Sequence, residues 1–205
     1  MKWEFSQELK KENFKNHTDL TLNSLYFEKE EITNEYINFE TLREVCFKRC
    51  ILTNVTFDNS FFGKVKFQNC ELINVAFSGS NLSNVDFDNC KLVSISIFET
   101  TLSNISIKES LIEYSKIENS KMDNSLFDDV KWMENIHRHN KYEYSNFTRC
   151  SFILDNFIDT KMKECDLKTS HFEDIKINLD EIITSKLSLL GLLEIVNTKG
   201  IIIEE

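Results

Sequence analysis

The residue types that most often carry chemistry are present in this sequence, but their spacing does not suit catalysis or metal binding. There are six cysteines without a CxxC pair, and the four histidines form no acid–base constellation. Zinc sites usually show closely spaced ligand pairs, and His137 with His139 is the one pair that could serve. Four glycines are too few for a phosphate-cradling loop, and GxSxG and HExxH motifs are absent. We therefore expect a protein that is not an enzyme and has no metal or cofactor.

The charge of the chain excludes two classes of partner. It carries 34 acidic and 24 basic residues, a net charge of −10. Direct binding to nucleic acid or to an anionic membrane requires a basic surface, so we expect neither. The first residues contain no apolar run suited to a signal peptide, and the apolar stretches Leu187–Val196 and Ile201–Ile203 are too short to cross a bilayer. The expected location is the cytoplasm.

Apolar side chains recur every five residues over most of the chain. Steps of five from Leu22 to Ile177 give 32 positions, of which 31 are apolar or aromatic and His137 is the exception. An α-helix would spread this period around its circumference, and a flat strand would send successive members to opposite faces. A solenoid that turns a corner every five residues keeps all of them inward. Because proline is absent and glycine is rare, other residues must form the corners.

A second inward column lies two residues before each of these centres. It holds small or β-branched residues such as Val45, Cys50, Val55 and Ser60, and five of the six cysteines fall in it. The thiols are therefore expected to be small buried core residues, not ligands. The three other positions of each unit are mostly polar, so each wall has two inward and three outward residues.

Units such as Ala76–Ser80, Asn81–Val85 and Asp86–Cys90 resemble the repeats of the pentapeptide-repeat family, although the small position holds Val and Cys more often than Ala. The resemblance covers residues 22–177. It implies an all-β solenoid, a right-handed quadrilateral β-helix with four units per coil and about 8 coils. At about 4.8 Å per coil, the rod would be roughly 38 Å long.

We expect three segments: an N-terminal cap or arm at 1–19, the β-helix at 20–178, and a helical cap and dimerisation segment at 179–205. Ser6–Lys15 is consistent with a short helix or an extended arm, Asn178 with a helix N-cap, and Ile201–Ile203 with a short strand. The C-terminal segment has more apolar residues than one terminal helix can bury, which favours a homodimer. The predicted dimer interface comprises Leu187, Leu189, Leu190, Leu192, Leu193, Ile195 and Val196.

Within the rod, one wall should stack phenylalanines from coil to coil. The predicted core ladder comprises Phe47, Phe67, Phe87, Phe127 and Phe147. One stretch, Glu134–Lys141, places His137 at an inward centre and Asn135 and Asn140 at small positions. We expect a local bulge or a short loop there.

Acidic residues are concentrated on one side of the predicted rod. The walls centred on Ile32 and Ile37 carry 13 acidic and 5 basic residues, a net of −8, whereas the other two walls carry 12 and 13, a net of +1. The acidic flank comprises Asp58, Glu71, Glu99, Glu113, Glu118, Glu134, Asp155, Asp159, Glu173 and Asp174. A rod with a regular negative flank resembles duplex DNA to a phosphate-binding protein.

The Qnr-type and MfpA-type quinolone-resistance proteins are similar to this chain in length, continuous repeat and apolar C-terminal segment. That resemblance implies a DNA mimic that binds a type II topoisomerase, DNA gyrase or topoisomerase IV, and that confers quinolone resistance. The alternative is a solenoid scaffold for an unrelated protein partner, whose charge only keeps the rod in solution. Charge reversal at Glu71, Glu113 and Asp155 should distinguish the two.

Overall fold

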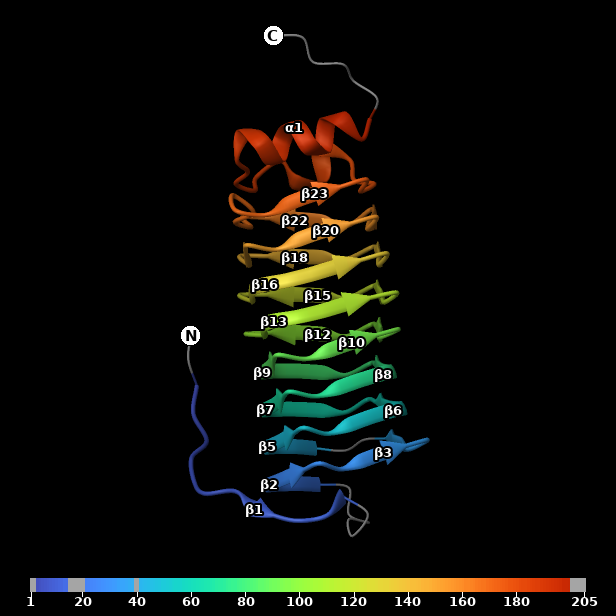
Figure 1. The fold of residues 1–205 in the computed structure, drawn as a ribbon, viewed down its shortest axis with the longest axis vertical. Helices are drawn as coiled ribbons and strands as arrows, with labels where there is room; N and C mark the ends of the chain where they lie inside the picture. Colours follow the sequence, from blue (N-terminus) through green and yellow to red (C-terminus); the bar gives the residue numbers. More distant parts are fainter. Residues whose placement is uncertain (1–2, 15–20, 39–40, 200–205) are drawn as a thin grey trace.

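At most repeat units of this chain a strand forms where an inward centre lies between two outward residues. The computed structural model describes residues 3–14, 21–38 and 41–199, and among them it places 23 strands in one continuous sheet. The strands stack as the coils of a rod, and helix α1 lies across its C-terminal end (Figure 1). The strand expected at Ile201–Ile203 lies outside the described residues.

The elements follow one another in the order of the coils. The first half of the rod contains β1 (Lys10–Lys11), β2 (Thr21–Glu28), β3 (Glu31–Thr33), β4 (Tyr36–Asn38), β5 (Thr41–Lys48), β6 (Ile51–Asp58), β7 (Phe61–Gln68), β8 (Glu71–Ser78), β9 (Asn81–Asp88), β10 (Lys91–Val93), β11 (Ser96–Phe98) and β12 (Thr101–Ser103). The second half contains β13 (Ser106–Glu113), β14 (Lys116–Glu118), β15 (Lys121–Asp123), β16 (Leu126–Met133), β17 (Ile136–Arg138), β18 (Lys141–Glu143), β19 (Asn146–Thr148), β20 (Ser151–Ile153), β21 (Asn156–Ile158), β22 (Lys161–Lys163), β23 (His171–Glu173), the 3-10 helix η2 (Leu179–Ile182) and α1 (Leu189–Asn197).

The strands pair in parallel with a constant offset of 20 residues. Thr21 lies beside Thr41, Thr41 beside Phe61 and Phe61 beside Asn81, and the same offset continues through the isolated bridge between Asp166 and Lys186. One coil therefore consists of four five-residue units. The predicted fold class is confirmed: the chain is a parallel β-solenoid of about eight coils with a short C-terminal helical cap.

The corners are formed by a backbone conformation that takes the place of glycine and proline. Two residues after almost every inward centre, φ is positive, between 47° and 61°. Among the described residues 28 non-glycine residues adopt it, and ten of them are asparagine, the side chain that tolerates this left-handed region best after glycine. Gly79 is the glycine of this series. A regular left-handed corner thus explains how a chain without proline turns every five residues.

The core is a set of side-chain stacks that run along the rod. Phe67 lies between Phe47 and Phe87 with ring centroids 4.9 Å away on each side and nearly parallel planes, and Phe127 stacks on Phe147 at 4.6 Å. All five rings of the predicted ladder are buried. The thiols of the small column are also buried, and each approaches the carbonyl oxygen 23 residues earlier, for example Cys50, Cys70 and Cys90.

An apolar cavity of about 50 Å³ lies in the middle of the core. It is lined by Phe87, Ile107 and Phe127 among other apolar residues, at the level where Ile107 interrupts the phenylalanine stack. The aliphatic side chain does not fill the space that a ring occupies in the neighbouring coils, so this part of the core is packed less well than the rest.

Replacement of Ile107 by phenylalanine is therefore expected to stabilise the rod. A ring at this position would fill the cavity and join the two parts of the stack, raising the free energy of unfolding by about 1 kcal/mol. Urea denaturation measures the change. Ile107→Val is the control, expected to cost about 0.5–1.5 kcal/mol. A loss of stability in Ile107→Phe would show that the cavity cannot accept a ring.

Residues 134–141 form neither a bulge nor a loop, and that prediction was wrong. β17 and β18 keep the 20-residue register with the strands before and after them. Asn135 and Asn140 fit the small column because their amides hydrogen-bond the backbone of the coil below. His137 stacks on Phe157 at 4.3 Å, and its Nδ1 lies 2.9 Å from the Tyr142 hydroxyl.

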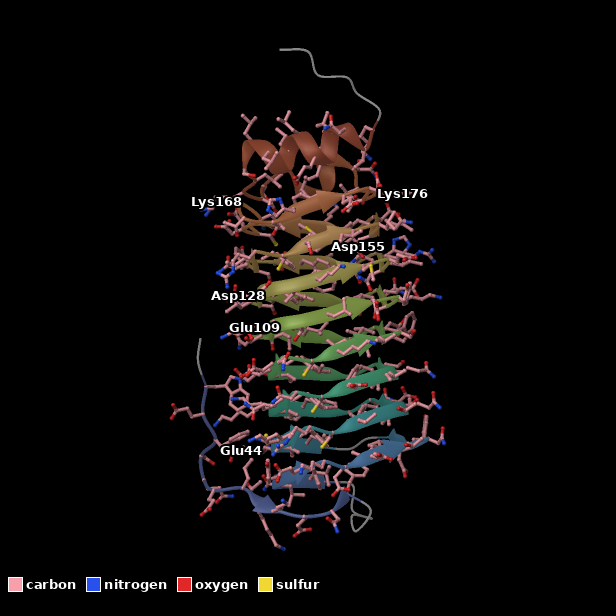
Figure 2. The ribbon with its side chains drawn as sticks, in the orientation of Figure 1. Glu44, Glu109, Asp128, Asp155, Lys168 and Lys176 are labelled. Carbon is pink, nitrogen blue, oxygen red and sulfur yellow. The ribbon has the colours of Figure 1, made fainter. Side chains whose placement is uncertain are left out.

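The N-terminal segment is extended and runs back along the outside of the rod (Figure 1). β1 pairs in parallel with β2 at the first coil. Beyond it, the Glu44 carboxylate accepts hydrogen bonds from the Ser6 backbone and hydroxyl, and the Trp3 indole N–H donates to Asp86 at 3.0 Å (Figure 2 labels Glu44). The segment covers the outer side of the first four coils, where Cys46 is buried although its position is outward.

The C-terminal cap supplies the side-chain contacts that a further coil would provide. The Glu181 carboxylate accepts hydrogen bonds from the backbone N–H of Thr160 at 3.1 Å and of Asn178 at 2.8 Å, the second of these forming the capping box of η2. The Ser185 hydroxyl accepts from the Cys165 N–H at 3.3 Å. Helix α1 then covers the last coil. The cap therefore accepts the hydrogen bonds of the column residues Thr160 and Cys165 at the end of the rod.

Candidate interaction surface

The outward positions of the Ile32 and Ile37 walls hold the predicted acidic flank. Those walls consist mainly of β3, β4, β10, β11, β14, β17, β20, β21 and β23, together with the halves of the eight-residue strands that continue them. The structure places the ten predicted residues in three groups. Exposed are Glu71, Glu99, Glu134, Asp159, Glu173 and Asp174; half-buried are Asp58, Glu113 and Glu118; Asp155 is buried.

Neighbouring coils neutralise part of this charge. Lys91 lies 3.8 Å from Glu113, Arg138 lies 3.3 Å from Glu118, and the imidazole of His139 lies 3.5 Å from Asp159. Asp58 accepts a hydrogen bond from the Tyr36 hydroxyl at 2.9 Å. Five of the six exposed flank carboxylates have no ion-pair partner in the part of the chain that the structure describes: Glu71, Glu99, Glu134, Glu173 and Asp174.

Asp155 does not belong to the exposed flank, and its assignment there was wrong. It occupies the small inward column two residues before Phe157, and its side chain is fully buried in the seventh coil (Figure 2). One carboxylate oxygen accepts the Asn135 backbone N–H at 2.7 Å, and the other has no hydrogen-bond donor among the described residues. Burial raises the pKa of Asp155 to about 7. This carboxyl therefore belongs to the core.

The two histidines considered as a metal pair lie on opposite sides of one wall. His137 is inward and buried, and burial lowers its pKa to about 3, so its ring is neutral at physiological pH. His139 lies at a left-handed corner and faces outward toward Asp159. Because the left-handed corner turns His139 outward while His137 points into the core, the two side chains cannot bind one metal ion.

The predicted dimer interface divides into two parts at the end of the rod. Leu189, Leu190 and Leu192 are exposed, the first by 75%. Ile195 is buried, which makes it part of the plug and not an available interface residue, and it faces the core of the last coil. The half-buried members are Leu187, Leu193 and Val196. The exposed leucines of α1 therefore form an apolar surface on the flat end of the rod.

One surface was missed at the sequence level. Tyr114 and Leu154 lie at left-handed corners of the ridge between the Ile32 and Ile37 walls, and they are 51% and 50% exposed. Large apolar residues at corner positions where the chain elsewhere uses asparagine are the signal that could have identified them.

Comparison with known proteins agrees with this architecture. The family model described as pentapeptide repeat region matches residues 40–117, and the same five-residue register continues on both sides of the match. Over residues 40–117 the chain is similar to the pentapeptide-repeat family. No curated protein matches the sequence. No helix in the described part of the chain is long and apolar enough to cross a membrane.

Three solved structures are similar to this chain. HetL, a pentapeptide repeat protein involved in heterocyst differentiation regulation from the cyanobacterium Nostoc, is 11% identical, with 81% of this chain and 84% of that chain covered and a TM-score of 0.38. Trypsin-treated QnrB1, a plasmid-mediated fluoroquinolone resistance protein, is 16% identical over 88% and 100%, with a TM-score of 0.42. An endo-xylogalacturonan hydrolase from Aspergillus tubingensis is 9% identical over 82% and 65%, with a TM-score of 0.40.

Proposed function

We propose that this protein is a non-enzymatic DNA mimic of the cytoplasm that binds a type II topoisomerase, DNA gyrase or topoisomerase IV, and that this binding confers quinolone resistance. The observation that carries the proposal is the acidic flank, whose exposed carboxylates lie on two adjoining walls of a straight rod. A protein that binds the phosphates of duplex DNA has a cationic groove of complementary shape.

The exposed leucines of α1 support a homodimer joined at the C-terminal ends. Two copies in line would form a rod of roughly 76 Å, which is longer than 20 base pairs at about 3.4 Å each. Leu189 and Leu190 would then be buried by the partner copy, and the acidic flank would be doubled in length.

Charge reversal on the flank tests the proposal. Glu71→Lys, Glu134→Lys and Glu173→Lys change three exposed carboxylates without touching the core. The triple variant is expected to inhibit gyrase supercoiling at least ten times less strongly than the unaltered protein and to bind gyrase correspondingly less well, because attraction to the cationic groove is lost. Supercoiling of relaxed plasmid and surface binding to purified gyrase measure the two effects.

Matched control variants carry the same change of charge on the other side of the rod. Glu109→Lys, Asp129→Lys and Glu164→Lys alter exposed residues of the Phe27 and Leu22 walls. This triple variant should inhibit gyrase supercoiling and bind gyrase within twofold of the unaltered protein. If the unaltered protein neither binds nor inhibits gyrase or topoisomerase IV at micromolar concentration, the topoisomerase proposal is wrong.

The second candidate is an interaction scaffold with an unrelated protein partner. The observation that favours it is the pairing of Glu113 and Glu118 with cations of the adjacent coils, which lowers the charge of the flank below that expected from the sequence. Equal gyrase effects of the two triple variants would support this scaffold over a DNA mimic.

A further inference from the structure

The corner residues of the ridge between the Ile32 and Ile37 walls change in type along the rod. In the first coils its left-handed corners are Asn34, Asn54 and Asn74. Their side chains form a ladder in which each amide donates to the carbonyl oxygen of the asparagine one coil below, at 2.9 and 2.8 Å. Asparagine suits this position for two reasons: it tolerates a positive φ, and it bonds to its neighbours.

Farther along the same ridge, the corners are Tyr114, Glu134 and Leu154, with φ of 54°, 56° and 58°. None of these residue types is favoured in the left-handed region, and leucine is among the least suited. Tyr114 and Leu154 expose half of their surface, so burial does not offset the strain. The positive φ itself belongs to the regular corner of every coil, so what distinguishes Tyr114 and Leu154 is the large apolar surface that they expose there.

The outward side chains beside these corners are also apolar. Met133 and Ile153 lie next to each other in register on the outer face of the Ile32 wall, and both are half-buried. With Leu154 they form a short apolar strip on a face where polar side chains would suit a solvated strand. Such strips on soluble proteins mark interaction surfaces.

Acidic residues surround the strip. Glu134 lies on the ridge between the two apolar corners, Glu113 lies one coil below Met133 on the same face, and Glu173 and Asp174 lie one coil above Ile153 and Leu154. A second copy presenting the same face would bring like charges together, and anionic membranes or nucleic acid would be repelled. The chemistry that fits is positive at the margin and apolar in the centre.

We propose that the Tyr114–Leu154 ridge, with Met133 and Ile153 beside it, is a docking surface for a polypeptide segment of a partner protein in which arginine or lysine residues flank a bulky apolar side chain. The inference rests on the proposed function, since it identifies the part of the acidic flank that makes the central contact. The apolar side chain packs against Leu154 and Met133, while the basic residues pair with Glu134, Glu173 and Asp174.

Binding of the full-length protein to a displayed library of random dodecapeptides tests the proposal. Enriched peptides should contain leucine, phenylalanine or methionine beside arginine or lysine. Synthetic copies should bind Leu154→Asn and Tyr114→Asn at least tenfold more weakly than the unaltered protein. Both substitutions introduce the residue that the chain uses at equivalent corners, so the variants should fold with unchanged or greater stability.

Tyr144→Asn is the matched control. Tyr144 occupies a left-handed corner with φ of 50° and is 52% exposed, but it lies on the diagonally opposite ridge. Its variant should bind the peptides within twofold of the unaltered protein. No enrichment of basic peptides, or equal binding by Leu154→Asn and the unaltered protein, overturns the proposal. A concentration-dependent dimer in sedimentation that Leu154→Asn abolishes would identify a second copy as the occupant and also overturn it.

The outcomes also distinguish this proposal from the proposal that the protein binds a topoisomerase. If gyrase does not bind but basic peptides bind in a Leu154-dependent manner, the topoisomerase proposal is rejected and the docking-surface proposal stands. If gyrase binds the unaltered protein and Leu154→Asn equally well and no peptides are enriched, the docking surface is rejected and the DNA mimic stands.

Discussion

Replacement of Asp155 by asparagine is expected to stabilise the protein above neutral pH. It should also remove the decline in stability that the unaltered protein shows as pH rises from mild acid to neutral. The reason lies in two other residues of the small column. In Asn135 and Asn140 the amide oxygen accepts the backbone N–H of the residue 20 positions earlier, and the amide nitrogen donates to the carbonyl 23 positions earlier. Each of these side chains satisfies two backbone groups.

Asp155 makes the first of these bonds but cannot make the second when it is ionised. Its free oxygen has no donor among the described residues, and the residue 23 positions earlier is Trp132. By the same register, we expect that oxygen to face the Trp132 carbonyl. A protonated carboxyl can donate to the carbonyl, whereas a carboxylate would place two acceptors together in a buried site.

The direction of the pH effect follows from the raised pKa. In the unfolded chain Asp155 ionises near its ordinary value of 3.8, and in the folded rod near 7. Between these values the folded state binds more protons, so the free energy of unfolding falls as pH rises, and the loss is complete above about pH 7. A shift of this size corresponds at most to about 4 kcal/mol. The free energy of unfolding of Asp155→Asn should therefore be higher than that of the unaltered protein by about 2–4 kcal/mol near pH 8.

Urea denaturation at a series of pH values between about 4 and 8 measures the effect. Asp159→Asn, which changes an exposed carboxyl of the same unit, is the control and should leave the pH profile unchanged. Parallel profiles for Asp155→Asn and the unaltered protein would show that the buried carboxyl ionises without cost in the folded rod.

The second large effect is expected from Phe67→Ala in the centre of the phenylalanine stack. Phe67 is fully buried and touches a parallel ring on each side, so the variant loses the apolar contact and leaves a cavity between two coils. The free energy of unfolding should fall by about 3–5 kcal/mol. Because coils contact only their neighbours, the loss should also weaken the coupling between the two parts of the rod.

Denaturant unfolding, followed by circular dichroism, provides both readouts. A midpoint shifted to lower urea reports the loss of stability, and a shallower transition reports the loss of coupling. Phe98→Ala is the control, since Phe98 faces outward and is 37% exposed. Similar losses in the two variants would mean that the stack contributes no more than a surface ring.

The repeat predicted the fold because every inward position is visible as an apolar or small residue at fixed spacing. It also predicted the fate of the five column cysteines, which lie in the core. The failures share one physical cause. At Asn135, Asn140 and Asp155 a polar side chain occupies an inward position and hydrogen-bonds the backbone of the coil below, so polarity alone wrongly predicted a bulge at the asparagines and an exposed position at the aspartate.

The corner conformation and the exposed ridge could not be obtained from hydrophobic periodicity. The frequency of asparagine two residues after each centre indicates the left-handed corner once the structure is known, but Tyr114 and Leu154 adopt the same φ without that preference. Periodicity also could not decide whether the N-terminal segment is a helix or an extended arm. The residues that hold it, Glu44 and Asp86, are distant from it in sequence.

The hydrogen bonding of the small column gives the rod a direction of assembly. The N–H of a column residue is completed by a side chain about 20 residues later, as in the pairs Ser60 with Ser80 and Ser115 with Asn135. During synthesis from the N-terminus, each newly emerged coil would therefore be finished only by the next one. The column N–H groups at the growing end would therefore lack their acceptors until Glu181 and Ser185 leave the ribosome. These two side chains end the series because they supply the acceptors that a further coil would provide.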